Sequence, residues 1–350
     1  MLGKTQAQEA ADGAVAVQAG RDVVMHVGVT TPEEVRALAS DTFKADFVKM
    51  LGMAEAIAEA RANKVLEAFI DRVERVNPSA LRYANDPDFR YTLYTAQKTA
   101  ARTDNSGLHD LLVELLVQRT FEAPRSLIQL VLNESIEVVQ RISTSQINTL
   151  SLAFVILTLR FASVASFDTF LKTMDVYVEP LLSDVAGSKA SLSHLEYAGC
   201  GTNSDTMRRL MADMLLRSYP GAFQQGASEA EAGIKVLSPA ARRLLVPCEH
   251  NPARVQVLSG TREMLDDLCK QLQLDERDTK MLQAIFQGQR IDVRNVRSVC
   301  ITKRPYLARL FDVWDKSALT SFSPTSVGIA IAHANLSKYG DIGPLSNWIN

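Results

Sequence analysis

The chain has 350 residues, of which 47% are hydrophobic and 22% are charged, as in an ordinary globular protein of about two domains. Its 38 basic and 40 acidic residues leave a net charge of −2, which excludes a global positive field that would attract nucleic acid or anionic lipid. Four scattered cysteines do not form a disulfide framework, so we expect a reducing, cytoplasmic location.

The clearest strand chemistry lies near the start, in "GAVAVQAGRDVVMHVG" at residues 13–28. Two valine-rich runs, 14–19 and 23–27, flank the turn-forming residues Gly20-Arg21-Asp22. Strands this short leave backbone groups unpaired and become stable only beside other strands. We therefore predict that residues 1–28 form an oligomerisation segment. Its interior is expected to comprise Val15, Val17, Val23, Met25 and Val27. The alternative is pairing with a short strand of the same chain within residues 291–302, which are rich in β-branched side chains.

A helix is expected to begin directly after this segment. The sequence Thr-Pro-Glu-Glu at residues 31–34 combines a capping box with proline in the first turn. Apolar residues then recur at helical spacing until Asn77-Pro78, with Gly52 as the expected kink. Unbroken, this helix would be roughly 65 Å long at about 1.5 Å per residue. Such a length favours packing along another long element, such as a second subunit.

Further helices follow in chain order, joined by short polar segments that imply antiparallel neighbours. They are predicted over residues 88–102, 107–120, 125–142, 146–163 and 167–182. The most apolar stretch, residues 150–167, carries Arg160 near its middle, so we expect a buried helix there and no membrane span. Residues 29–185 are therefore assigned to a long helix and a helical bundle.

The remainder is expected to contain a loop-rich connection and a smaller domain. Glycine, serine and alanine dominate residues 186–236, with a helix near 203–217. The C-terminal domain, residues 237–350, is expected to be helical. Its helices are predicted near 239–246, 260–273, 276–288 and 303–314 and from Pro324 onward.

The sequence contains no motif that identifies a catalytic site. There is no Gly-x-Ser-x-Gly elbow and no phosphate-binding loop. Cys248-Glu249-His250 is the one close cysteine–histidine pair, and a zinc site needs about four ligands. Gly199-Cys200-Gly201 would make a nucleophile only if a base such as His194 lay beside the thiol, the alternative being a flexible interdomain turn.

Carboxylates in the apolar helices do not suggest a metal site. Glu114, Glu134 and Glu137 lack the Glu-x-x-His pattern of two-metal bundles, so we expect them on solvated helix faces. We predict no catalytic residue, no metal ligand and no cofactor, and we favour a protein that is not an enzyme.

Residues 290–309 are locally cationic and follow two predicted helices, an order compatible with a winged-helix module. The segment "ALTSFSPTSVGIAIA", residues 318–332, resembles the strand-to-helix close of winged-helix domains, although extra residues precede Gly328. Arg294, Arg297 and Arg304 are therefore the candidates for nucleic-acid contact, an interaction that the net charge does not favour.

Both ends of the chain resemble a known group of proteins. "VAVQAGRDVVMHVG" (residues 15–28) before the Thr-Pro-Glu-Glu helix start, "SPTSVGIAIAHANL" (residues 323–336) and the late Trp348 are similar to a family of uncharacterised bacterial proteins. These carry a Gln-x-Gly-x-Asp/Asn-Val β repeat before a long helical region. The resemblance implies no settled activity; related β motifs occur in bacterial proteins linked to phage defence or abortive infection, which suggests that context.

The sequence thus predicts a mainly α protein: a multi-helix bundle with a short amino-terminal β segment of two strands and a smaller, winged-helix-like C-terminal domain. The predicted function is that of a cytoplasmic, non-enzymatic protein that forms a homo-oligomer and binds a protein partner. The alternative is a DNA-binding regulator that acts through its C-terminal domain.

Overall fold

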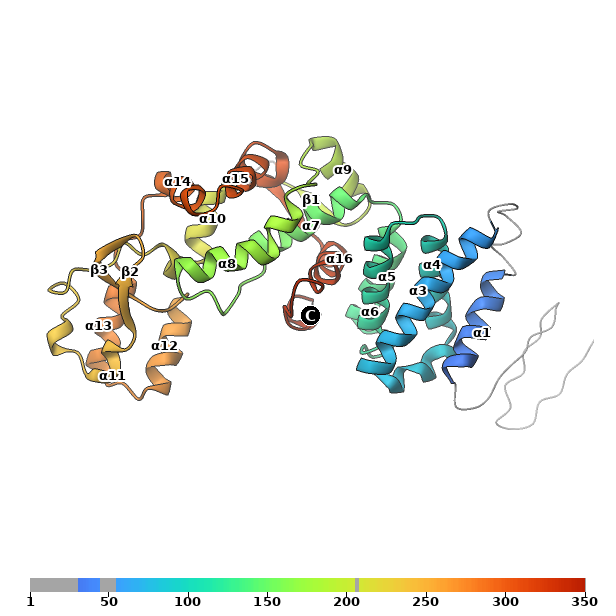
Figure 1. Ribbon diagram of the computed structural model, residues 1–350, viewed down its shortest axis with the longest axis horizontal. Coiled ribbons are helices and arrows are strands. Elements are labelled where there is room, and N and C mark those ends of the chain that lie inside the picture. The colour runs from blue at the N-terminus through green and yellow to red at the C-terminus, as the bar shows by residue number, and fades with distance from the viewer. Residues whose placement is uncertain (1–30, 45–54, 205–207, 350) are drawn as a thin grey trace, which may run out of the picture.

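The computed structural model describes residues 31–44, 55–204 and 208–349, and the fold is mainly α, as the sequence predicts. Figure 1 shows an elongated, arched molecule with a helical bundle at one end, a small α/β unit at the other and a central helical layer between them. Two small antiparallel sheets of two strands each complete the described part of the chain.

The amino-terminal bundle contains the first helices that the sequence predicts. They are α1 (Pro32–Phe43), α3 (Glu55–Val76), α4 (Pro87–Ala101), α5 (Ser106–Arg119) and α6 (Leu127–Val139). Polar side chains cap the starts of several of these helices, for example Asp86 before α4, Asn105 before α5 and Ser126 before α6. The apolar faces of α3, α4, α5 and α6 meet in one continuous core.

The prediction of a single long helix over residues 32–76 is wrong. Arg36 Nε lies 2.9 Å from a carboxylate oxygen of Glu67, whereas 31 residues of one straight helix would separate them by about 46 Å. The chain therefore reverses between α1 and α3, and Phe43 at the end of α1 packs with Ala58 and Ala62 of α3. The two apolar stripes face each other and α4, so helix length no longer argues for a second subunit.

The central layer combines the middle of the chain with its C-terminal part. Its helices are α7 (Thr144–Leu157), α8 (Phe167–Tyr177), α9 (Lys189–Tyr197), α10 (Met211–Ser218), α14 (Val293–Lys303), α15 (Leu307–Asp315) and α16 (Ser326–Leu336). The predicted buried helix is α7, which packs against α16. Strands β1 (Gly201–Asn203) and β4 (Phe322–Pro324) pair antiparallel beside them. Within the described ranges, no helix is both long and apolar enough to cross a membrane.

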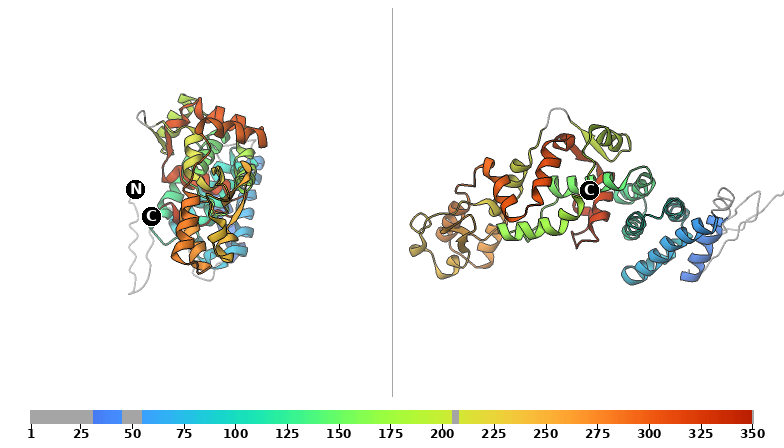
Figure 2. Two further views of the ribbon diagram at one scale, coloured as in Figure 1. Left: turned by 90° about the vertical axis from the view of Figure 1, so that its left-hand side faces the viewer. Right: turned by 45° about the horizontal axis from the view of Figure 1, so that its top comes forward.

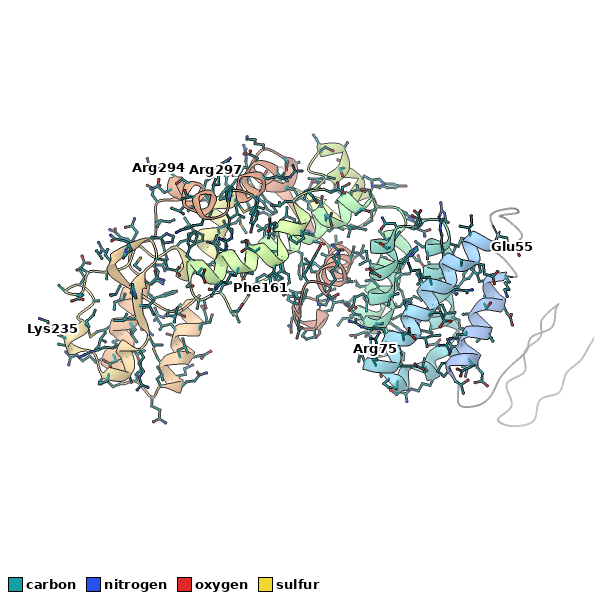
Figure 3. The ribbon with its side chains drawn as sticks, viewed as in Figure 1. Glu55, Arg75, Phe161, Lys235, Arg294 and Arg297 are labelled. Carbon is teal, nitrogen blue, oxygen red and sulfur yellow. The ribbon has the colours of Figure 1, made fainter. Side chains whose placement is uncertain are left out.

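The small unit at the other end has its own hydrophobic core, which includes Val257, Leu265 and Phe286. It contains α11 (Pro239–Arg242), β2 (Leu245–Cys248), β3 (Asn251–Val257), α12 (Arg262–Gln271) and α13 (Glu276–Phe286). Strands β2 and β3 form an antiparallel hairpin. In Figure 3, the labelled Lys235 lies at the outer limit of this unit, and Glu55 and Arg75 lie near the two ends of α3 in the opposite bundle.

The C-terminal half is divided differently from the prediction. Buried residues from 291 onward, including Val296, Leu310 and Trp314, belong to the core of the bundle and central layer. Buried residues between Leu237 and Phe286 instead pack in the core of the small unit. The predicted winged-helix close also lies outside the small unit, because β4 pairs with β1.

The strand expected within residues 291–302 is instead helix α14. Asp292 caps this helix by accepting a hydrogen bond from the Arg294 amide. Val296 and Cys300, four residues apart, are its buried positions, so the apolar side chains follow helical spacing. The many β-branched residues predicted a strand, but burial of this one face against the rest of the protein favours the helix.

Candidate functional site

The residues predicted to mediate oligomerisation, Val15, Val17, Val23, Met25 and Val27, lie outside the described residues. The description begins at the junction that follows them. The Thr31 amide donates to Glu34 Oε2 at 3.0 Å, and Thr31 Oγ1 accepts from the Glu34 amide at 3.3 Å, as the capping box requires. Helix α1 lies at the end of the molecule remote from the small unit (Figures 1 and 2).

The three arginines predicted to contact nucleic acid are engaged within the protein. They pair as Arg294 with Asp292 at 2.6 Å, Arg297 with Asp312 at 2.8 Å and Arg304 with Asp175 at 2.8 Å. Figure 3 shows Arg294 and Arg297 near each other along α14. Arg304 joins the end of α14 to α8, a tertiary link rather than a free cation. Each arginine is paired with an aspartate, and Asp312 also pairs with Lys316 at 3.0 Å, so no specific observation favours a nucleic-acid interface here.

The Cys200 thiol is not placed for nucleophilic catalysis. Cys200 is fully buried, and burial raises the pKa of its thiol to about 12. His194, the predicted base, instead hydrogen-bonds through Nδ1 to the Gln146 amide group at 3.0 Å. The segment is not a flexible turn either, because Gly201 begins β1 and lies against the Phe322 ring, where a Cβ would overlap it.

Cys248 and His250 both bind backbone carbonyls. The Cys248 thiol lies 3.3 Å from the Gln224 carbonyl oxygen, and His250 Nε2 lies 2.8 Å from that of Ala222. The His250 ring also stacks on Phe223 with ring centroids 6.2 Å apart. These contacts fasten the hairpin to the segment that leads into the small unit. No group of three or more histidine, cysteine or acidic residues in the described ranges could hold a metal ion.

Glu249, between these two residues, joins the small unit to the central layer. Its carboxylate accepts hydrogen bonds from the Phe167 amide and, at 3.2 Å, from the Asp168 amide, the first two residues of α8. A helix N-terminus favours negative charge because its first amides lack partners inside the helix. The contact of the Glu249 carboxylate with the start of α8 therefore docks the β2–β3 hairpin on the central layer. We call this contact the hairpin latch.

A groove runs between the amino-terminal bundle and the end of the chain, and it encloses about 480 Å³. We call it the C-terminal groove. Its lining comprises Arg72, Glu114, Gln118, Phe121, Glu122, Leu132, His333, Ser337 and residues 340–345. Of the three carboxylates singled out in the sequence, Glu114 lies in this groove, whereas Glu134 is exposed on α6 and Glu137 is partly exposed.

Hydrogen bonds link the side chains of the groove wall, and the donor and acceptor of each bond follow from the Gln118 amide group. Gln118 Nε2 donates to Glu114 Oε1 at 3.0 Å and meets His333 Nδ1 at 3.1 Å. An amide nitrogen can only donate, so His333 Nδ1 accepts; its Nε2 then carries the proton and donates to the Gly343 carbonyl at 2.8 Å. His333 is therefore neutral, and burial lowers its pKa accordingly.

Sequence analysis did not identify this groove. The available signal was His333 within the mostly apolar residues 326–336, because a polar side chain on a buried helix must find partners. Those partners, Gln118 on α5 and Gly343 near the chain end, are brought together only by tertiary packing.

One comparison with known proteins gives a match, and it covers most of the chain. A protein-family model matches residues 29–349, and the family is an uncharacterised one. No curated protein and no solved structure matches the chain.

Proposed function

We propose that this protein, which belongs to an uncharacterised protein family whose model spans residues 29–349, is a non-enzymatic interaction protein that self-associates through residues 1–28. The observation that carries the proposal is the junction at residues 28–31. There the alternating valine segment ends, the family match begins and the capping box starts α1. The family match thus leaves residues 1–28 out, and Thr31 and Glu34 cap α1 without them.

The position of α1 supports this role. It lies at one extremity of the elongated body (Figure 1), so copies joined through the preceding segment have room to extend away from one another. Of the two pairing partners that the sequence leaves open, residues 293–303 are helical and offer no strand edge. This supports the same segment of a second copy as the pairing partner of the two predicted strands.

The setting we propose is the bacterial cytoplasm during phage infection, on the resemblance of the β motif to those of proteins linked to phage defence or abortive infection. The test is the efficiency of plating of a phage panel on cells that express the full chain or the chain without residues 1–28. The proposed setting requires protection by the full chain and its loss on truncation; equal plating on both strains and on cells without the protein contradicts it.

Light scattering coupled to size-exclusion chromatography tests self-association. The full chain, with a subunit mass of 38.5 kDa, should elute at a multiple of that mass, and the chain without residues 1–28 at the mass of a single subunit. The truncated chain retains the capping box, so its helical circular dichroism and melting temperature are the controls for folding. An unchanged number of subunits after truncation refutes the proposal.

A further inference from the structure

The C-terminal groove has the size and composition of a ligand site. Its volume of about 480 Å³ lies in the range of small-molecule pockets. One part is apolar, formed by Leu132, Ile342 and Leu345. Phe121 stands beside it with 58% of its surface exposed, an unusual position for a large aromatic side chain.

Apart from Arg72, the polar side chains that line the groove already use their hydrogen-bond donors. Both Gln118 Nε2 hydrogens are directed at Glu114 and His333, and the His333 Nε2 hydrogen is used on Gly343. The Ser337 hydroxyl donates to the Ala334 carbonyl of its own helix. Apart from the Arg72 guanidinium, these side chains retain mainly the capacity to accept hydrogen bonds.

The unused acceptors include two carboxylates. Glu122 and Asp341 line the groove, and neither forms an ion pair with any cation in the described part of the chain. Asp341 accepts a hydrogen bond from the Gly343 amide at 2.8 Å, and the Glu122 carboxylate accepts one from the Ser126 hydroxyl at 3.4 Å. Each keeps its negative charge and most of its lone pairs for another partner.

Two further features keep the groove negative. The one cationic lining residue, Arg72, is directed at Glu114 at 3.5 Å and stands at the edge shared with a neighbouring pocket of about 360 Å³. His333, being neutral, contributes no positive charge.

We propose that the C-terminal groove binds an aliphatic ammonium or guanidinium group, with its stem against the apolar part and its charged end between Glu122 and Asp341. Such a group supplies only donors, matches the two carboxylates and gains a favourable contact with the exposed face of Phe121. A free aliphatic diamine and the lysine or arginine side chain of a peptide share this chemistry. The inference does not depend on self-association, because every residue named lies in the described body.

Isothermal titration calorimetry of the full chain with two matched ligand pairs tests the proposal. The first pair is putrescine and butanediol, which have stems of equal length and differ in charge. The second pair is an acetylated Gly-Arg-Gly amide and the same peptide with neutral citrulline. At least one cation should bind, and more weakly as salt rises, whereas the neutral partners should not. Binding of putrescine alone identifies a free amine as the source, and binding of the arginine peptide alone identifies a peptide.

Variants locate the binding. Glu122→Gln should weaken the affinity by about fivefold or more, and the double variant with Asp341→Asn should weaken it further. Glu134→Gln, on the exposed side of α6 and outside the groove lining, is the matched control and should change affinity less than about twofold. If Asp341→Asn unsettles the turn at Gly343, Glu122→Gln alone decides. Equal binding of charged and neutral ligands, an equal loss with Glu134→Gln, or no binding of either cation would overturn the proposal.

Discussion

The hairpin latch yields the most direct test of how the small unit is held. Glu249→Ala removes the carboxylate that accepts from the Phe167 and Asp168 amides, and it leaves the local cap of α8 intact, because Ser166 Oγ still accepts from the Thr169 amide at 3.2 Å. Helix α8 should therefore stay folded while its attachment to the β2–β3 hairpin weakens. The variant isolates a contact between two units from the stability of either.

The size of the effect follows from two contributions. Loss of a side-chain acceptor at a helix start costs about 1 kcal/mol, and loss of a negative charge beside the helix dipole costs a further 0.3–1 kcal/mol, roughly. Glu249 is exposed, so water replaces part of both contributions. We expect the free energy of unfolding to fall by about 1 kcal/mol, and by roughly half of that in Glu249→Gln, which retains an oxygen acceptor.

Urea unfolding measures this change, and hydrogen exchange followed by mass spectrometry places it. Exchange should accelerate in peptides that contain residues 166–170 and in those of the hairpin. Glu229→Ala is the control: this glutamate is exposed in the same region and has no side-chain hydrogen bond or ion pair among the described residues. Unchanged protection of the Phe167 and Asp168 amides in Glu249→Ala would refute the latch.

Two further predictions concern the close contact between Gly260 and Val164 and the protonation of His333 in the C-terminal groove. Gly260→Ala should destabilise the protein by about 2 kcal/mol or more, because its Cβ would lie 1.9 Å from the Val164 carbonyl oxygen. Gly107→Ala, whose Cβ would lie 3.4 Å from its nearest neighbour, should be neutral or stabilising in thermal melts. Equal melting temperatures for the two variants would contradict the close contact between Gly260 and Val164. Burial lowers the pKa of His333 in the folded state, so the unfolded chain binds the proton more readily and stability should fall as pH drops below the ordinary value of 6.5. His333→Gln should flatten this slope in urea titrations between about pH 5 and 6.5, and an unchanged slope would contradict a neutral His333.

Local signals in the sequence were sufficient for most of the helices. The helices from 87 to 177 begin within two residues of their predicted starts, because capping residues such as Asn105 and Ser126 mark those starts, whereas α7 and α8 end six and five residues before their predicted ends. The same signals did not show where the chain turns back. Apolar spacing continues from α1 into α3, and it takes tertiary contacts such as the Arg36–Glu67 ion pair and the packing of Phe43 on Ala58 to show that the two helices are neighbours.

Long-range pairing explains the other differences. The pairing of β1 with β4 and the return of α14, α15 and α16 to the central core depend on contacts between residues more than a hundred positions apart. Cys200 and Cys248, the two cysteines considered in the sequence for thiol or metal chemistry, are both buried, and the Cys248 thiol donates to the Gln224 carbonyl. Conversely, the C-terminal groove has no linear motif, because its walls come from α3, α5, α6, α16 and the chain end.

The central claim is that one face of the amino-terminal β segment joins copies of this chain, and light scattering on two matched full-length variants tests it most directly. One variant changes the predicted interior, Val15→Ser, Val17→Ser, Val23→Ser and Val27→Ser; the other changes the alternate positions, Ala14→Ser, Ala16→Ser, Val24→Ser and His26→Ser. The account predicts a mass of one subunit, 38.5 kDa, for the first variant and the wild-type multiple for the second. A wild-type mass for the first variant, or a single-subunit mass for the unaltered chain, would contradict it.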